Sequence, residues 1–222
     1  MNAIETPRAV VFDMDGLMFN TEDLYTMVGT ELLRRRGQQF TDRLKDAMMG
    51  VRPRQAFEKM IEHCGLDESW EELAEESNEI FVGLLDEHLK MMPGLGELLD
   101  DLEAAGLPKA IATSSDRGLA ELCLARFGLT PRFEFLLASD GVEHSKPHPE
   151  VYLAAAERLG LAPGQMLVLE DSENGCKAAA AAGAFTVAVP GPHSFEQDFR
   201  MADLVADSLG DPRLYEVLGL AR

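Results

Sequence analysis

The stretch Ala9-Val10-Val11-Phe12-Asp13-Met14-Asp15-Gly16 decides the fold and the place of the chemistry. A short run of apolar residues is typical of a buried parallel strand, and two aspartates one residue apart follow it directly. Side chains two apart on an extended backbone point to the same side, so both carboxylates are expected to face the crevice beyond the strand. Alone this motif is weak, because aspartate and glycine also favour turns and helix caps.

Further apolar runs alternate with helical segments, which predicts an α/β fold with a doubly wound parallel sheet and helices on both faces. After the first strand, the expected strands lie at 110–112, 135–138, 166–169, 186–189 and 204–206. The segment between the first two strands is too long for one crossover and its pattern is helical. We therefore predict an inserted α-helical cap domain at 18–89 and an α/β catalytic core made of 1–17 and 90–222.

Within the predicted cap, glutamates alternate with apolar residues between 71 and 81, as in an amphipathic helix. A solvated helix face explains these acids better than a binding surface does. The methionine pairs Met48-Met49, in the cap, and Met91-Met92, just after it, are typical of adaptable apolar packing.

Charge and composition exclude several classes of function. Lys and Arg total 20 against 39 Asp and Glu, a net charge of −19, so binding to nucleic acid or to an anionic membrane is not expected. A phosphate substrate would need a local positive site inside this repulsive field. The first residues carry no long apolar run and the 3 cysteines form no CxxC pair, so we expect a cytoplasmic location. Nothing in the sequence indicates the oligomeric state.

Three further strand ends carry polar residues that could serve one reaction, because open parallel sheets bind ligands at the carboxyl ends of their strands. Thr113-Ser114-Ser115 offers hydroxyls and amides at the start of a helix, where an anion is favoured, although helix capping explains it equally well. Ser145-Lys146-Pro147 offers one cation. Glu170-Asp171-Ser172 offers another acidic pair, followed by Gly175 and an alanine-rich helix.

In this order and on these elements, the four motifs resemble the haloacid dehalogenase superfamily over essentially the whole chain, including an inserted helical cap. The resemblance is closest to the subgroup of β-phosphoglucomutase and the sugar-phosphate phosphatases. The string Phe12-Asp13-Met14-Asp15-Gly16-Leu17 with Asn20-Thr21-Glu22, and the string from Glu170 to Gly175, resemble phosphatases of the pseudouridine-5′-phosphatase type.

The resemblance implies the chemistry. Asp13 would be the nucleophile that forms an aspartyl-phosphate, and Asp15 would be the general acid and base. Mg²⁺ would be held by the Asp13 side chain, the Asp15 main-chain carbonyl and Asp171, with Glu170 bound directly or through water. Charge repulsion opposes the attack of a carboxylate on an anionic phosphate, and a bound Mg²⁺ would offset that repulsion.

The resemblance also implies which residues bind the substrate. Lys146, Thr113 and Ser114 would bind the phosphate. Arg54, Arg52 and Thr21 are the candidate cap residues that would contact the rest of the substrate, the arginines through their guanidinium groups. An arginine without any binding role is an equally good explanation for 52 and 54.

The sequence therefore predicts a magnesium-dependent phosphatase of a small phosphorylated metabolite, a sugar phosphate or nucleotide-like phosphate. One alternative is a phosphosugar mutase, but Tyr25 stands where β-phosphoglucomutase has a histidine. Another is a non-catalytic phosphometabolite-binding protein, against which the intact aspartates argue. Pro147 and Pro149 forbid a regular helix through His144 and His148, so these are expected to be loop histidines and not a zinc pair.

Overall fold

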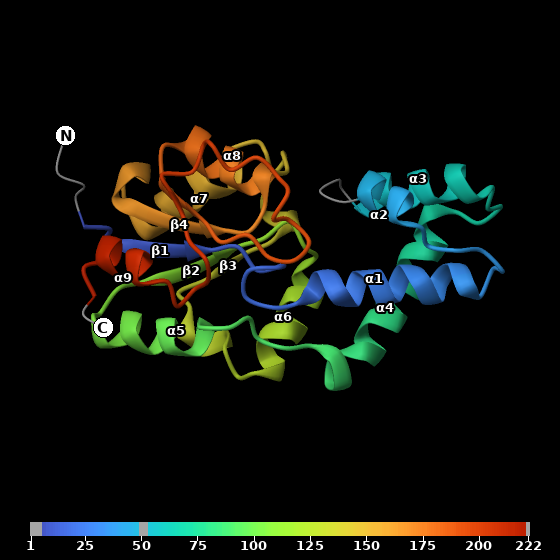
Figure 1. Cartoon of the computed structure of the whole chain (residues 1–222), viewed down its shortest axis with the longest axis horizontal. Coiled ribbons are helices and arrows are strands. Elements are labelled where there is room, and N and C mark those ends of the chain that lie inside the picture. The colour runs from blue at the N-terminus through green and yellow to red at the C-terminus, as the bar shows by residue number, and fades with distance from the viewer. Residues whose placement is uncertain (1–5, 49–52, 221–222) are drawn as a thin grey trace. The chain divides into compact units, whose positions relative to one another are not determined.

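The computed structural model describes residues 6–48 and 53–220. The chain forms two compact units: residues up to Asn20 together with those from Lys90 onward form the first, and Thr21–Leu89 form the second. Each unit has its own hydrophobic core. Figure 1 shows the helices and strands of both units.

The first unit is built on a parallel sheet of six strands in the order β3-β2-β1-β4-β5-β6. The strands are β1 (Ala9–Phe12), β2 (Lys109–Ala112), β3 (Leu136–Leu137), β4 (Met166–Glu170), β5 (Phe185–Ala188) and β6 (Leu204–Val205). The predicted doubly wound parallel sheet is confirmed. The two edge strands are shorter than their apolar runs suggest, because each pairs on one side only.

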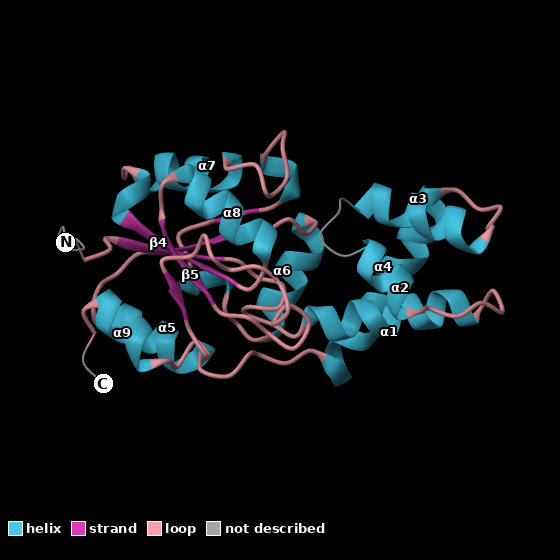
Figure 2. Cartoon of the chain, turned by 45° about the horizontal axis from the view of Figure 1, so that its top comes forward, coloured by secondary structure: helices cyan, strands magenta, loops and turns pink. Residues whose placement is uncertain are grey.

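Helices cover both faces of this sheet (Figures 1 and 2). One face carries α5 (Leu95–Ala104), α6 (Arg117–Arg126) and α9 (Pro212–Leu218), and the other carries α7 (Glu150–Leu159) and α8 (Glu173–Ala182). Three 3-10 turns lie between them: η1 (Thr130–Arg132), η2 (Ser139–Gly141) and η3 (Pro163–Gln165). β1 lies in the middle of the sheet, between β2 and β4, so its carboxyl end is flanked by the ends of both neighbours.

Small side chains bring α7 and α8 close to the sheet. Ala155 and Ala178 are fully buried in one cluster with Val11 and Val168 of the central strands. Tyr152 is the exception in size, a fully buried aromatic residue among alanines. A buried tyrosine needs a partner for its hydroxyl group, and this one finds its partner at the carboxyl end of β4.

The second unit is helical, with α1 (Thr21–Arg34), α2 (Asp42–Met48), α3 (Pro53–Cys64) and α4 (Trp70–His88). Its buried core contains Leu32, Leu33, Leu44, Met60 and Leu73. Ser69 caps the start of α4: its hydroxyl accepts the Glu72 N–H, while the Glu72 carboxylate accepts the Ser69 N–H. Within the described ranges, no helix combines the length and the apolar character needed to cross a membrane.

The chain leaves and re-enters the first unit at two neighbouring residues. The Asn20 N–H donates to the Lys90 carbonyl at 3.1 Å, and the Asn20 side-chain Oδ1 accepts the Lys90 N–H at 2.7 Å. Phe19 and Met91 form an isolated antiparallel bridge beside them. These bonds hold the two crossing segments together.

Candidate active site

The centre of the site is a buried contact between an acid and an amine at the end of β1. Asp13 directly follows the strand and is 6% exposed. The Lys146 ammonium donates to Asp13 Oδ1 at 2.5 Å, to Glu170 Oε1 at 2.7 Å and to the Ala112 carbonyl at 3.0 Å. The lysine thus joins the ends of β1, β2 and β4.

Burial and charge act against each other in this pair. Burial raises the pKa of Asp13 well above its ordinary value, although the Lys146 ammonium opposes that rise. Burial alone would lower the pKa of Lys146, but the carboxylates of Asp13 and Glu170 raise it well above its ordinary value. Lys146 therefore stays charged and supplies a fixed positive charge inside a strongly acidic protein.

Glu170 is fully buried, and both of its oxygens accept hydrogen bonds. Oε1 accepts Lys146 and, at 2.5 Å, the Tyr152 hydroxyl, while Oε2 accepts the Ser172 hydroxyl at 3.1 Å. The Lys146 ammonium also lies 5.1 Å from the centre of the Tyr152 ring. Burial and the nearby Glu170 charge raise the pKa of Tyr152, which keeps its proton available for this bond. Tyr152 therefore helps to fix the Lys146–Glu170 pair.

Two glycines make room for the acids. A Cβ on Gly16 would lie 2.2 Å from Asp171 Oδ2, and a Cβ on Gly175 would lie 1.8 Å from Glu170 Oε1. Gly16 also has a φ of 78°, a conformation that other residues rarely adopt. The glycine of the first motif thus accommodates an acid of the fourth, and Gly175 accommodates the other.

Asp15 is held on one oxygen only. Its Oδ2 accepts the Ser115 hydroxyl at 2.7 Å and the Thr113 hydroxyl at 3.0 Å. Its Oδ1 is buried and makes no hydrogen bond in the described part of the chain. An unpartnered buried polar atom is costly unless a ligand satisfies it, so this oxygen is a candidate to form a hydrogen bond with a bound molecule.

The buried acids fit a hard divalent cation. Asp13, Glu170 and Asp171 each offer a carboxylate oxygen, and these atoms lie within 4.8 Å of one another. A donor set of oxygens alone suits Mg²⁺, and Gly16 leaves the space that Asp171 occupies. The Asp15 side chain is not part of this cluster. Metal binding by the Asp15 main-chain carbonyl stays a prediction.

The remaining predicted residues lie in different surroundings. Thr113 is buried and Ser114 is exposed at the start of the segment leading to α6. Thr21 is the first residue of α1, fully buried, with a hydroxyl that makes no hydrogen bond among the described residues. Arg54 pairs with Glu58 at 2.7 Å on α3, and its guanidinium lies 5.6 Å from the centre of the Trp70 ring. Arg52 lies outside the described residues.

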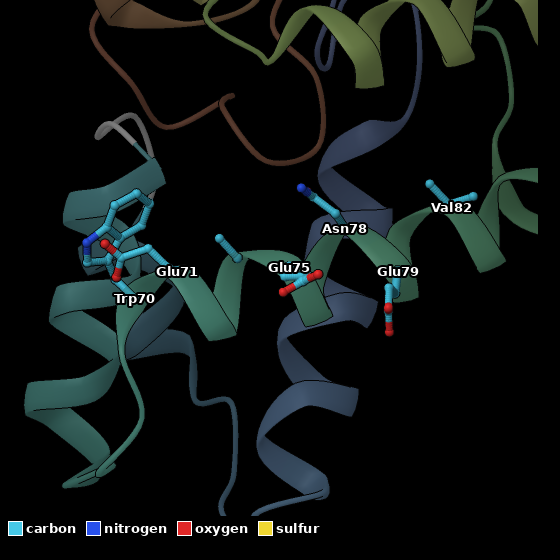
Figure 3. Close-up of a pocket in the computed structure, with 7 residues that line it drawn as sticks. Trp70, Glu71, Glu75, Asn78, Glu79 and Val82 are labelled. Atoms are coloured by element: carbon cyan, nitrogen blue, oxygen red, sulfur yellow. The ribbon is translucent and has the colours of Figure 1, made fainter.

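A shallow pocket lies on α4 of the second unit (Figure 3). It is lined by Trp70, Glu71, Ala74, Glu75, Asn78, Glu79 and Val82. These residues recur at helical spacing along one helix, and the glutamates among them are exposed, as expected for a solvated face. The pocket holds none of the residues predicted to carry the chemistry.

Sequence reasoning missed the supporting residues of the site. Ser115 was visible only as one hydroxyl in a polar string, and nothing in that string shows that it holds Asp15. Tyr152 fits the apolar period of α7 and therefore looks like core. The usable signal was a tyrosine among alanines, since a buried hydroxyl must find a partner.

The chain belongs to the haloacid dehalogenase-like hydrolase family, whose model matches residues 10–189. It is 36% identical over 207 residues to a "probable pseudouridine-5′-phosphatase" of Drosophila melanogaster, covering 90% of this chain and 89% of that protein. It is 34% identical to a phosphorylated carbohydrates phosphatase of Thermotoga maritima, covering 79% and 82% of the two chains.

A solved structure supports the same relationship. The crystal structure of CbbY from Rhodobacter sphaeroides in complex with phosphate matches with a TM-score of 0.79 at 27% sequence identity. The match covers 91% of this chain and 95% of that one. The fold thus agrees with the family across nearly the whole chain.

Proposed function

We propose that this hydrolase is a magnesium-dependent phosphatase that cleaves a small phosphorylated sugar or related phosphate monoester through an aspartyl-phosphate on Asp13. The observation that carries the proposal is the buried cluster of Asp13, Lys146, Glu170 and Asp171 beside an Asp15 oxygen left without a partner. Relatives named as phosphatases of phosphorylated carbohydrates, hexitols and fructose 1-phosphate support the substrate class.

In the first step the Asp13 carboxylate attacks phosphorus, and the bond between phosphorus and the leaving oxygen breaks. Asp15 gives its proton to that oxygen, a contribution typically worth about 10²–10⁴-fold in rate. Thr113 and Ser115 keep the other Asp15 oxygen in place, so Oδ1 is the atom that exchanges the proton. The products are the free alcohol and the phosphorylated aspartate.

In the second step water attacks the phosphorus of the aspartyl-phosphate while Asp15 takes a proton from it. The bond between phosphorus and Asp13 breaks, which releases inorganic phosphate and restores the nucleophile. Lys146 stays beside Asp13 and offsets the negative charge of the phosphate. Asp13, Asp171 and Glu170, the last directly or through water, would hold Mg²⁺, and the ion would add positive charge beside the transferred phosphate.

The second unit is proposed to act as the cap that selects the substrate. Thr21 and Arg54 are the described candidates, and Arg54 would have to leave Glu58 or use its remaining donors. Tyr25 packs on Phe81 with ring centres 5.0 Å apart, and a tyrosine is a poor substitute for a histidine in proton transfer. This favours hydrolysis over a mutase reaction.

The test is release of inorganic phosphate from a panel of sugar, hexitol and nucleotide monoesters, with Mg²⁺ and with chelator. We expect release that requires Mg²⁺ and is nearly abolished in Asp13→Asn. Asp15→Asn should also lose turnover, with the fold checked by circular dichroism.

Two results would overturn the proposal. Sustained interconversion of hexose 1-phosphate and 6-phosphate with little free phosphate would identify a mutase. A null result on the whole panel, with phosphate esters still bound, would identify a non-catalytic binding protein.

A further inference from the structure

Two histidines and a glutamate of the first unit converge on one point, and none of them belongs to the acidic cluster described above. His144 Nδ1 lies 2.8 Å from Glu150 Oε2, and His148 Nδ1 lies 3.7 Å from the same oxygen. The two imidazole rings are tilted by 32° with centres 4.5 Å apart. One ligand atom from each of the three residues lies within 4.8 Å of the others.

We propose that His144, His148 and Glu150 form a second metal site, for a transition-metal ion such as Zn²⁺. Two imidazole nitrogens and one carboxylate oxygen are a donor set that zinc accepts, with a solvent molecule as the fourth ligand. The catalytic cluster offers only oxygens, which suit Mg²⁺. The two sites therefore differ in the metal they prefer, and this inference does not depend on the proposed phosphatase activity.

The turn that carries the site is well suited to hold it. Glu150 is fixed at the start of α7, because its Oε1 accepts the Glu143 N–H at 2.6 Å and its Oε2 accepts the His144 N–H at 3.0 Å. Pro147 and Pro149 restrict the backbone on either side of His148. These prolines exclude a regular helix through His144 and His148, but the turn brings the two imidazole rings together without one.

The proposed site is open to solvent, so an ion can reach it and retain a water molecule as its fourth ligand. The side chains of His144 and His148 are 60% and 50% exposed, and that of Glu150 is 29% exposed. A bound ion would replace the proton that His144 now shares with Glu150. Lys146 stands between the two histidines in sequence while its ammonium contacts Asp13, so an ion here would secure both flanks of the catalytic lysine.

The test is Zn²⁺ binding to the untagged full chain, measured by calorimetry in excess Mg²⁺ and in an Asp171→Asn background that weakens the catalytic cluster. We expect one equivalent of Zn²⁺ to bind. Binding should weaken at least about tenfold in His144→Gln and in His148→Gln, since even supporting residues of a metal site cost that much. His63→Gln, which changes an exposed histidine of α3, is the matched control and should bind normally.

A second readout is independent of affinity. In the histidine side-chain nuclear magnetic resonance spectrum, Zn²⁺ should shift the signals of His144 and His148 and leave those of His63, His88 and His193 in place. Zn²⁺ should also raise the Tm of the chain but not that of the His144→Gln/His148→Gln double variant. Failure to bind Zn²⁺, or equal binding by the double variant, would overturn the proposal.

Discussion

At the scale of single residues, the charged groups of the site are held in position by hydrogen bonds from their neighbours. Lys146 reaches three strand ends at once, and Glu170 shares one oxygen between this lysine and the Tyr152 hydroxyl. Because the Glu170 oxygens already accept these donors and Ser172, we expect Glu170 to position Lys146 as much as to serve a metal.

Replacing Tyr152 with phenylalanine tests this arrangement. The ring keeps its packing among the alanines of α7 and α8, but Glu170 loses one donor and Lys146 loses part of its anchorage. We expect kcat to fall about tenfold, equivalent to about 1.4 kcal/mol of barrier, with little change in KM. Steady-state kinetics on the best substrate of the panel would measure it. Tyr215→Phe, a buried tyrosine of α9, is the control, and an unchanged kcat in Tyr152→Phe would remove the assigned role.

Replacing Gly175 with alanine tests the close approach of α8 to Glu170. The added Cβ would lie within 2.0 Å of three atoms of a buried carboxylate that cannot move without breaking its bonds. We expect destabilisation of about 1–3 kcal/mol, the usual cost of overpacking, together with loss of activity. Urea unfolding would measure the loss of stability, and phosphate release would measure the loss of activity. Gly96→Ala in α5, where a Cβ meets nothing within 4 Å, should be neutral or stabilising; equal stability of both variants would contradict the clash.

Sequence patterns revealed the acids but not their supports, for a physical reason. Asp13, Asp15 and Asp171 follow strands, and the carboxyl ends of parallel strands must meet at one edge of the sheet. The hydrogen bonds of Ser115 and Tyr152 depend on distances between elements that no local period encodes. The candidate cap residues are harder still, since a side chain such as Arg54 can pair locally with Glu58.

At the scale of elements, ion pairs join the helices and turns around the sheet. Glu103 of α5 accepts Arg132 of η1 at 2.7 Å and Lys109 of β2 at 3.1 Å. Hydrogen bonds from Arg132 and Lys109 lower the pKa of Glu103 to about 2. The charged form of this carboxyl therefore stabilises the folded chain.

This ion pair predicts a pH-dependent stability difference between the wild type and Glu103→Gln. A folded-state pKa below the unfolded one contributes stability that is complete above the unfolded pKa, about 4.3 for glutamate, and is lost as pH falls toward the folded pKa. Urea midpoints at pH 7, 5, 4 and 3 should show a deficit in the variant that is constant down to pH 5 and then shrinks. A deficit that grows on acidification would contradict this assignment.

Element boundaries show where sequence prediction works and where it does not. The central strands match their apolar runs closely, because a strand buried on both sides is mostly apolar. At the edges, β3 and β6 keep only two residues each, although four and three were expected. Hydrogen bonding to a single neighbour decides these ends, and a run of apolar letters does not contain that information.

At the scale of the whole molecule, the two units have separate cores. Leu32 is fully buried in the helical unit, and Leu99 is fully buried in the sheet-containing unit. Leu32→Ala should destabilise its unit by about 2–5 kcal/mol and lower amide protection in 21–89. Leu99→Ala should destabilise the first unit by a similar amount and lower amide protection in that unit. Hydrogen exchange with mass spectrometry would measure both, and equal loss of protection throughout the chain in both variants would show a single cooperative unit instead.

The hydrogen bonds between Asn20 and Lys90 have a consequence for the evolution of the chain. Because the two crossings are hydrogen-bonded neighbours, the 69 residues of Thr21–Leu89 begin and end at nearly the same place. A segment with adjoining ends can be shortened, extended or exchanged between relatives without altering the spacing of any strand. Substitutions, insertions and deletions can therefore accumulate in Thr21–Leu89 while the acids at the strand ends keep their positions.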